Sequence, residues 1–146
     1  MERRKGYRFM PHMADVMFVA SGRTLNSAFK NAELALFDTI ADMKSIEKNT
    51  GKVHSIKINL KARSLEDLAW KMLQYTLSES DSRSLFCYKV SDISVKRGNG
   101  FALHAEVLAK EKNVEASKLE VKGISKYMLK VSKTRHGFSI SVVVDV

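Results

Sequence analysis

Three carboxylates near the two ends of the sequence could together hold a metal ion. Asp15 stands directly before the apolar run 16–20, and Asp145 follows the apolar run 142–144, with the main-chain carboxylate of Val146 beside it. If the first and last strands are neighbours, these groups converge, and a divalent cation is the natural way to neutralise them. Acid oxygens suit calcium or magnesium and not zinc. Taken singly, Asp15 could instead accept backbone hydrogen bonds, and Asp145 could be a solvated terminal acid.

Two further residues have side chains that could join such a site. His12 lies three residues before Asp15 at the expected strand entrance, where it could also cap a turn after Pro11. Lys122 interrupts the apolar segment 119–124, and it is an ordinary sheet lysine unless it faces a site.

Asp38 and Asp42 are four residues apart near the end of a predicted helix. Acids at that end oppose the helix dipole and repel one another. The cost indicates that at least one of them has a partner, either Lys44 or an ion.

The chain offers little for nucleophilic chemistry. Its one cysteine, Cys87, lies inside an apolar run and is interpreted as a core thiol. The remaining histidines are scattered, and no pair has the spacing of a metal-binding helix. A stand-alone hydrolase, in which carboxylates and a divalent ion would activate water, lacks a nucleophile–base pair.

Composition predicts one folded domain over residues 1–146. The chain is 45% hydrophobic with one Pro and seven Gly, and it is long enough to bury a core without disulfides. No apolar run is long enough to span a membrane, and the basic N-terminus lacks the apolar region of a secretory signal. We therefore expect a cytoplasmic protein.

The net charge of +9 leaves two interpretations open. Lys and Arg number 25 against 16 Asp and Glu, an excess that favours contact with polyanions such as RNA. The basic residues are dispersed, however, which also fits a solvated surface without a dedicated patch. Lys57, Lys61 and Arg63 alternate on one strand face and could touch phosphate, but no interleaved aromatic residues mark a base-stacking platform.

Periodicity predicts an α+β two-layer sandwich, with two helices packed on one face of a mostly antiparallel sheet. Apolar residues recur at helical spacing from Thr24 to about residue 46 and again after Ser64, and the serine-rich segment 78–82 is expected to close the second helix. Alternation predicts strands at the following residues: 16–20, 53–62, 85–95, 101–109, 119–131 and 138–144.

The same residues resemble the archease family. Residues 11–16, Pro-His-Met-Ala-Asp-Val, resemble its H-T-A-D signature, and the segment 22–38 is similar to its G-x-T-L-x-x-A-F-x-x-A helix ending in L-F-D. Near the other end, residues 120–124 resemble its E-V-K-A-[IV] strand, and residues 142–146 resemble its terminal apolar-D-[IV]. The likeness covers nearly the whole chain in the correct order.

This resemblance implies an accessory protein and not an enzyme. Archeases activate the RtcB-type RNA-splicing ligase in tRNA exon joining by promoting its guanylylation with GTP and its multiple turnover. The family's metal site corresponds to Asp15, Asp145 and Val146, with calcium expected ahead of magnesium. Asp42 and Lys122 match an acidic and a basic position of its functional surface. The alternative function is a direct tRNA-binding or chaperone-like modulator of tRNA processing or modification.

Overall fold

The computed structural model describes residues 6–11 and 15–146, which form helices and strands in the order β1, β2, α1, α2, β3, α3, β4, β5, η1, β6, β7 and β8. The strands are β1 (Tyr7–Met10), β2 (Val16–Gly22), β3 (His54–Ala62), β4 (Leu85–Gly98), β5 (Gly100–Glu111), β6 (Gly123–Ile124), β7 (Lys130–Thr134) and β8 (Gly137–Asp145). The helices are α1 (Leu25–Ile40), α2 (Met43–Lys48), α3 (Leu65–Ser82) and the short 3-10 helix η1 (Val114–Ala116).

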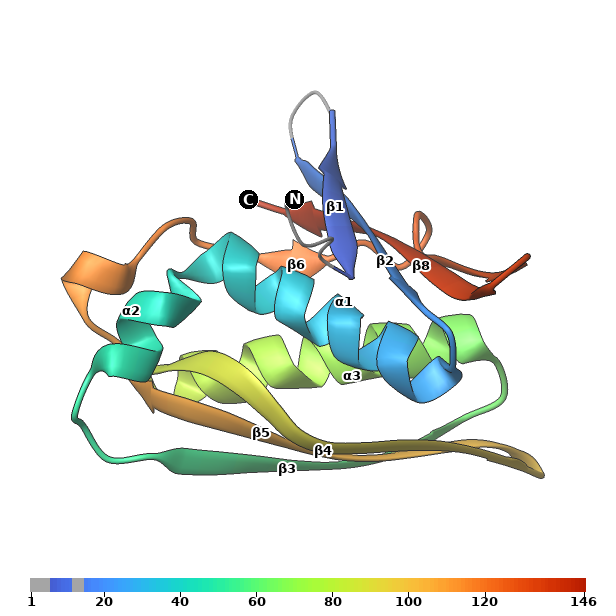
Figure 1. The fold of residues 1–146 in the computed structure, drawn as a ribbon, viewed down its shortest axis with the longest axis horizontal. Coiled ribbons are helices and arrows are strands. Elements are labelled where there is room, and N and C mark those ends of the chain that lie inside the picture. The colour runs from blue at the N-terminus through green and yellow to red at the C-terminus, as the bar shows by residue number, and fades with distance from the viewer. Residues whose placement is uncertain (1–5, 12–14) are drawn as a thin grey trace.

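The strands form two antiparallel sheets with the helices between them (Figure 1). The larger sheet has the order β1-β2-β8-β6, and β7 also pairs with β8. The smaller sheet has the order β3-β5-β4. Helix α1 packs against β2 and β8 on one side and β4 on the other, while α3 packs mainly on β3.

The predicted α+β class with mostly antiparallel strands is confirmed. The prediction of one sheet with both helices on one face is corrected, because a second sheet covers the other side of the helices. The physical reason is the width of the apolar surface of α1. Its buried residues from Ala28 to Thr39 span about 200° of the helix circumference, which is twice the stripe that a helix on a single sheet needs.

Two predicted boundaries were wrong. The serine-rich segment 78–82 does not end α3, because the helix continues to Ser82. Within this last turn Ser80 is buried, and its hydroxyl donates a hydrogen bond to the Leu77 carbonyl. The predicted strand 119–131 is reduced to two short strands, β6 and β7. The chain before β6 instead turns back on α1, where the backbone N–H groups of Lys118 and Leu119 donate to the Ile40 carbonyl.

A buried carboxyl group lies in the helix layer shared by the two sheets. Glu33 on α1 is fully buried, and its Oε2 accepts a hydrogen bond of 2.6 Å from the Thr76 hydroxyl on α3. Its Oε1 has no hydrogen-bond partner among the described residues. Burial raises the pKa of Glu33 to about 8, and the Thr76 hydrogen bond opposes this only in part. Glu33 is therefore mainly neutral at pH 7.

None of the helices in the part of the chain that the structure describes has both the length and the apolar composition of a bilayer-crossing segment.

Candidate functional site

The pairing of β2 with β8 brings two of the predicted metal ligands to one end of the larger sheet. In the antiparallel ladder, Val16 lies opposite Val144. Asp15 comes just before Val16 and Asp145 just after Val144, so both carboxylates stand at the same end of neighbouring strands. Val146 follows directly and is 37% exposed. The assumption that the first and last of the predicted strands are neighbours is thus confirmed.

We call this end of the sheet, formed by Asp15, Asp145 and Val146, the acidic edge. Within the described residues, no three side chains of His, Cys, Asp or Glu come together as a metal-binding group. The acidic edge has only two such side chains, and its third oxygen ligand would be the main-chain carboxylate of Val146. Because every donor is oxygen, the set fits a hard cation such as calcium or magnesium. That Asp15, Asp145 and the main-chain carboxylate of Val146 bind a metal ion remains a prediction.

Lys122 lies beside the acidic edge. Its backbone N–H donates a hydrogen bond of 2.7 Å to the Asp145 carbonyl, and its side chain is exposed. Lys122 is not inside a long strand as predicted, since β6 begins only at Gly123, which pairs with Asp145. The structure therefore brings the Lys122 backbone next to Asp145, a placement that the sequence pattern could not give.

Two residues of α3 that the sequence analysis did not single out hold β6 in place. Because β6 pairs with β8 on one side only, the backbone groups of Ile124 point the other way, toward α3. The Trp70 indole N–H donates a hydrogen bond of 2.9 Å to the Ile124 carbonyl. The Gln74 amide oxygen accepts a hydrogen bond of 3.3 Å from the Ile124 N–H. The four-residue spacing puts both side chains on one helix face, which was the signal available in the sequence.

Gln74 also borders the acidic edge. A Cβ atom added at Gly123 would lie 3.8 Å from the Asp145 Oδ2 and 4.0 Å from the Gln74 Oε1. Both oxygens therefore approach the same glycine, one from β8 and one from α3. Gln74 thus positions the strand that pairs with Asp145, and its amide adds polar character to this end of the sheet.

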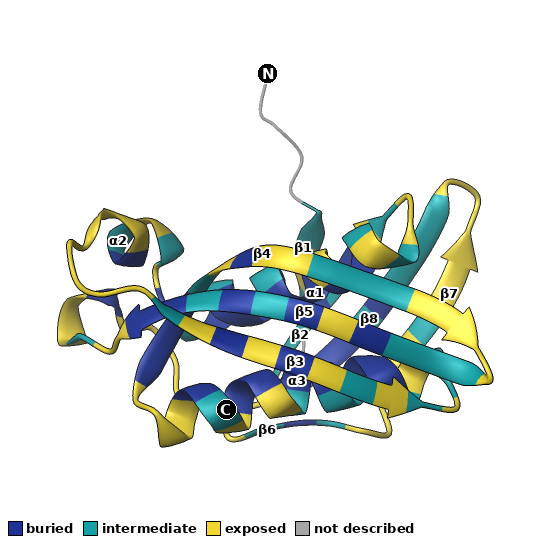
Figure 2. Ribbon diagram, turned by 90° about the horizontal axis from the view of Figure 1, so that it is seen from below, coloured by how far each residue is buried: buried dark blue, intermediate teal, exposed yellow. Residues whose placement is uncertain are grey.

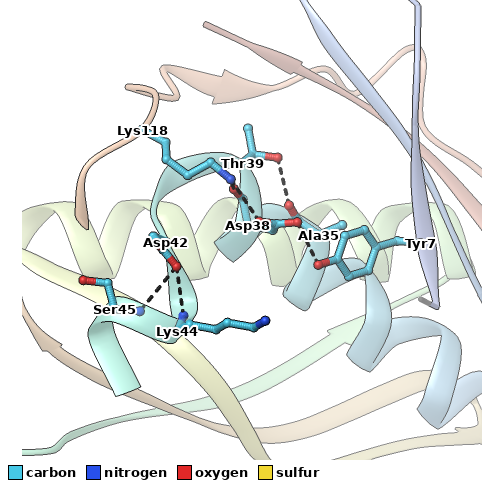
Figure 3. A network of polar contacts seen from close by, with 8 residues as sticks. All are labelled: Tyr7, Ala35, Asp38, Thr39, Asp42, Lys44, Ser45 and Lys118. Atoms are coloured by element: carbon cyan, nitrogen blue, oxygen red, sulfur yellow. Dashed lines mark hydrogen bonds and ion pairs between the residues drawn. The ribbon is translucent and has the colours of Figure 1, made fainter. Parts of the chain in front are cut away.

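Asp42 has a structural role in the folded chain. It is the N-cap of α2, and its Oδ1 accepts from the backbone N–H groups of Lys44 at 3.1 Å and Ser45 at 3.3 Å (Figure 3). The prediction that it ends the first helix is corrected, because α1 stops at Ile40 and a second helix starts after Asp42. An acid at a helix start is favourable, so its expected conflict with the dipole does not arise.

Asp38 has the partners that the sequence pattern required, although they are not the ones expected. Its carboxylate accepts a hydrogen bond of 2.9 Å from the Tyr7 hydroxyl and forms an ion pair of 3.0 Å with the Lys118 ammonium (Figure 3). Burial, followed by the hydrogen bond and the charge of Asp38, raises the pKa of Tyr7 well above its usual range. Asp38 therefore joins β1 and the segment before β6 to α1. His12, the remaining candidate, lies outside the described residues.

The fold and the acidic edge define a two-sheet α+β domain with a carboxylate-rich end of one sheet, and comparison with known proteins gives its family. The model of the Archease protein family matches residues 7–146. Protein archease of Methanosarcina barkeri is 31% identical over 146 residues, covering 97% of each chain. Protein archease of Archaeoglobus fulgidus is 29% identical, covering 96% of this chain and 98% of the relative. The chain belongs to the archease family.

Solved structures support the fold. The solution structure of protein 1598 of Methanobacterium thermoautotrophicum aligns with a TM-score of 0.77 at 22% identity, covering 98% of this chain and all of the other. The crystal structure of a Thermotoga maritima archease, described as a possible chaperone, aligns with a TM-score of 0.64 at 16% identity and covers 98% of that protein. At these identities the likeness concerns the fold alone.

Proposed function

We propose that this protein is an accessory factor that activates an RtcB-type RNA-splicing ligase in tRNA exon joining. It would promote ligase guanylylation with GTP and multiple turnover, and it would use a divalent cation at the acidic edge, with calcium preferred over magnesium. The observation that supports the proposal best is the β2–β8 register, in which Asp15 and Asp145 flank the Val16–Val144 pair.

The chemistry of the acidic edge fits a cation that is shared with a partner. Calcium takes six to eight oxygen ligands, and three carboxyl groups supply three if each binds through one oxygen, so other positions would be open to a second molecule. Asp145 and Val146 are exposed, and the Lys122 backbone is bonded to Asp145. The cation would offset most of the negative charge of the carboxylates, and its open positions could bind oxygen atoms of the second molecule. The Lys122 ammonium would add a charge suited to a phosphate group.

The test is guanylylation and ligation by a purified RtcB-type ligase, with and without this protein, for wild type, Asp15→Asn and Asp145→Asn. We expect each substitution to lower calcium affinity by about tenfold or more and to reduce stimulation, since it removes a charged ligand. Asp92→Asn, an exposed acid on the other sheet, is the matched control and should leave stimulation unchanged. Full stimulation by Asp15→Asn would contradict the proposed role of the acidic edge.

A direct RNA-binding or chaperone-like role is the second candidate. The net charge of +9 favours it, and the Thermotoga maritima relative of the same fold is described as a possible chaperone. It predicts salt-sensitive tRNA binding without a ligase, whereas activation predicts faster ligase guanylylation without RNA. Both assays on the same preparation separate the two candidates.

A further inference from the structure

One face of the smaller sheet is open. The inward-facing side chains of β3 and β5, such as Ile58 and Ala105, are buried against the helices, while their sequence neighbours point outward. Figure 2 looks onto the outward face, and no helix crosses in front of the three strands. In Figure 1 this face lies on the far side of the helix layer from β2 and β8.

Two rows of outward side chains form a shallow groove near the β4–β5 turn. In the first row, Ala102 on the central strand pairs with Lys61 on β3 and Lys96 on β4. In the next row, His104 pairs with Asn59 and Ser94. The groove has a volume of about 510 Å³. We call it the basic groove, and its low floor is due to the small side chain of Ala102 between two long ones.

The lysines of the basic groove have no neutralising partner among residues 6–11 and 15–146. The side chains of Lys61, Lys96 and nearby Arg63 are exposed and make no ion pair or hydrogen bond with the described part of the chain. Residues 59–65 and 94–104 contain no acid. Neighbouring strands are about 4.8 Å apart, so the two lysines are held on strands about 10 Å apart with only Ala102 between them. An anion above Ala102 would be attracted by both.

The other end of the same face is different, because it carries acids that offset part of its lysine charge. Glu106 accepts hydrogen bonds from the hydroxyls of Ser55 at 2.8 Å and Ser91 at 2.7 Å, and these bonds lower the pKa of its carboxyl group. Lys57 lies opposite Glu106 in the ladder, so its charge is partly compensated. The other end of this face therefore carries two acids, Glu106 and Asp92, beside its lysines, whereas the basic groove carries lysines without acids.

The second row adds hydrogen-bonding groups. The His104 Nδ1 and the Asn59 Oδ1 are 2.8 Å apart, which directs the Asn59 amide N–H groups away from the ring. The His104 Nε2 lies 3.4 Å from Asp92, at the boundary with the end of the face that carries the acids. The Ser94 hydroxyl, across β5 from Asn59, is a further donor. Lysines with amide and hydroxyl donors are the groups that contact nucleic-acid phosphates.

We propose that the basic groove binds the phosphate backbone of an RNA strand, with one phosphate between Lys61 and Lys96 above Ala102. The groove lacks both the large apolar anchor of a protein interface and an outward aromatic platform for bases, so binding would be independent of sequence. The proposal deepens the RNA-binding candidate and does not depend on ligase activation, because the acidic edge belongs to the other sheet.

The experiment uses a fluorescein-labelled single-stranded RNA of about twelve nucleotides, titrated with the full chain by fluorescence anisotropy at several salt concentrations. The variant is Lys61→Ala/Lys96→Ala. The matched control is Lys57→Ala/Lys89→Ala, which removes two exposed lysines from the same face at its other end. We expect the groove variant to bind about tenfold more weakly, with the slope of log K against log salt smaller by about 1.4, and the control to change little.

Three outcomes would overturn the proposal. Equal losses in the two double variants would mean that only the overall charge attracts RNA. Competition by polyglutamate as effective as by unlabelled RNA would assign the groove to an acidic protein. Wild-type affinity in Ala102→Glu, which puts a carboxylate on the groove floor and is checked for folding by circular dichroism, would also contradict it. The groove variant should still stimulate a ligase, so failure here is distinguishable from failure of the activation proposal.

Discussion

The two sheets share one helix layer, yet acids gather at one end of the larger sheet and lysines gather on the open face of the smaller one. The larger sheet ends in the acidic edge, where Asp15 and Asp145 stand on neighbouring strands. The smaller sheet presents Lys61 and Lys96 on either side of Ala102. Packing cannot explain this contrast, because both sets of side chains lie outside the core and the inward residues alone hold the layers together. The difference supports the proposal that the two surfaces bind different ligands.

The largest effect is expected at the turn that starts β8, the strand carrying the acidic edge. Gly137 has φ +152°, and a Cβ there would lie 2.1 Å from the Gly22 carbonyl oxygen. Gly137→Ala should lower the free energy of unfolding by about 3 kcal/mol, because both the strain and the clash involve backbone. Urea unfolding measures this loss of free energy. Gly98→Ala, in the hairpin of the other sheet, is the control, because nothing lies within 4 Å of a Cβ atom added there. Equal stability of the two variants would contradict the assignment.

The shared helix layer should make the stability of the whole molecule depend on pH through Glu33. Below pH of about 4.5 this carboxyl is protonated in both the folded and the unfolded chain. As the pH rises toward about 8, the unfolded chain loses the proton and the folded chain keeps it, so stability falls, and the loss is complete above the folded pKa. The loss from this group should be a few kcal/mol, because each unit of pKa difference between the folded and unfolded chain corresponds to about 1.4 kcal/mol.

Glu33→Gln should remove this slope, because the amide does not titrate while its oxygen can still accept from Thr76. Thermal unfolding at several pH values between the two limits is the measurement. Glu111→Gln, an exposed acid at the end of β5, is the control and should follow the wild-type profile. A wild-type slope retained in Glu33→Gln would show that other groups cause the pH dependence.

The sequence predicted the parts of this molecule that depend on local pattern. Alternation along residues 53–62 gave β3 and its outward lysines, and the positions of Asp15 and Asp145 next to apolar runs indicated the acidic edge. It did not predict the division into two sheets, because alternation shows which face is buried but not which strand is the neighbour. The sequence did not predict strand β6 for a related reason. A two-residue strand has no period, and the bonds from Trp70 and Gln74 that hold it come from 54 and 50 residues away.

A smaller effect should separate the acidic edge from the basic groove directly. Trp70→Phe keeps the aromatic ring but removes the N–H that satisfies the Ile124 carbonyl, so stability should fall by about 1 kcal/mol. Because β6 pairs with Asp145, calcium affinity by isothermal titration calorimetry should fall several-fold, while RNA affinity stays at the wild-type value. Tyr75→Phe on the exposed side of α3 is the control. A parallel loss of both affinities would show that the two sites are not independent.

The smallest effect concerns Asp42, for which the sequence and the structure indicate different roles. Asp42 is the N-cap of the six-residue α2, so Asp42→Ala should lower the free energy of unfolding by about 1 kcal/mol. Asp42→Asn should lower it much less, because Asn also caps helices. Neither substitution should change calcium affinity if the carboxylate serves only the backbone N–H groups of Lys44 and Ser45. Ligase stimulation by Asp42→Asn then decides the matter. Reduced stimulation with stability and calcium affinity intact would assign the Asp42 charge to the partner surface, whereas full stimulation would confine Asp42 to capping α2.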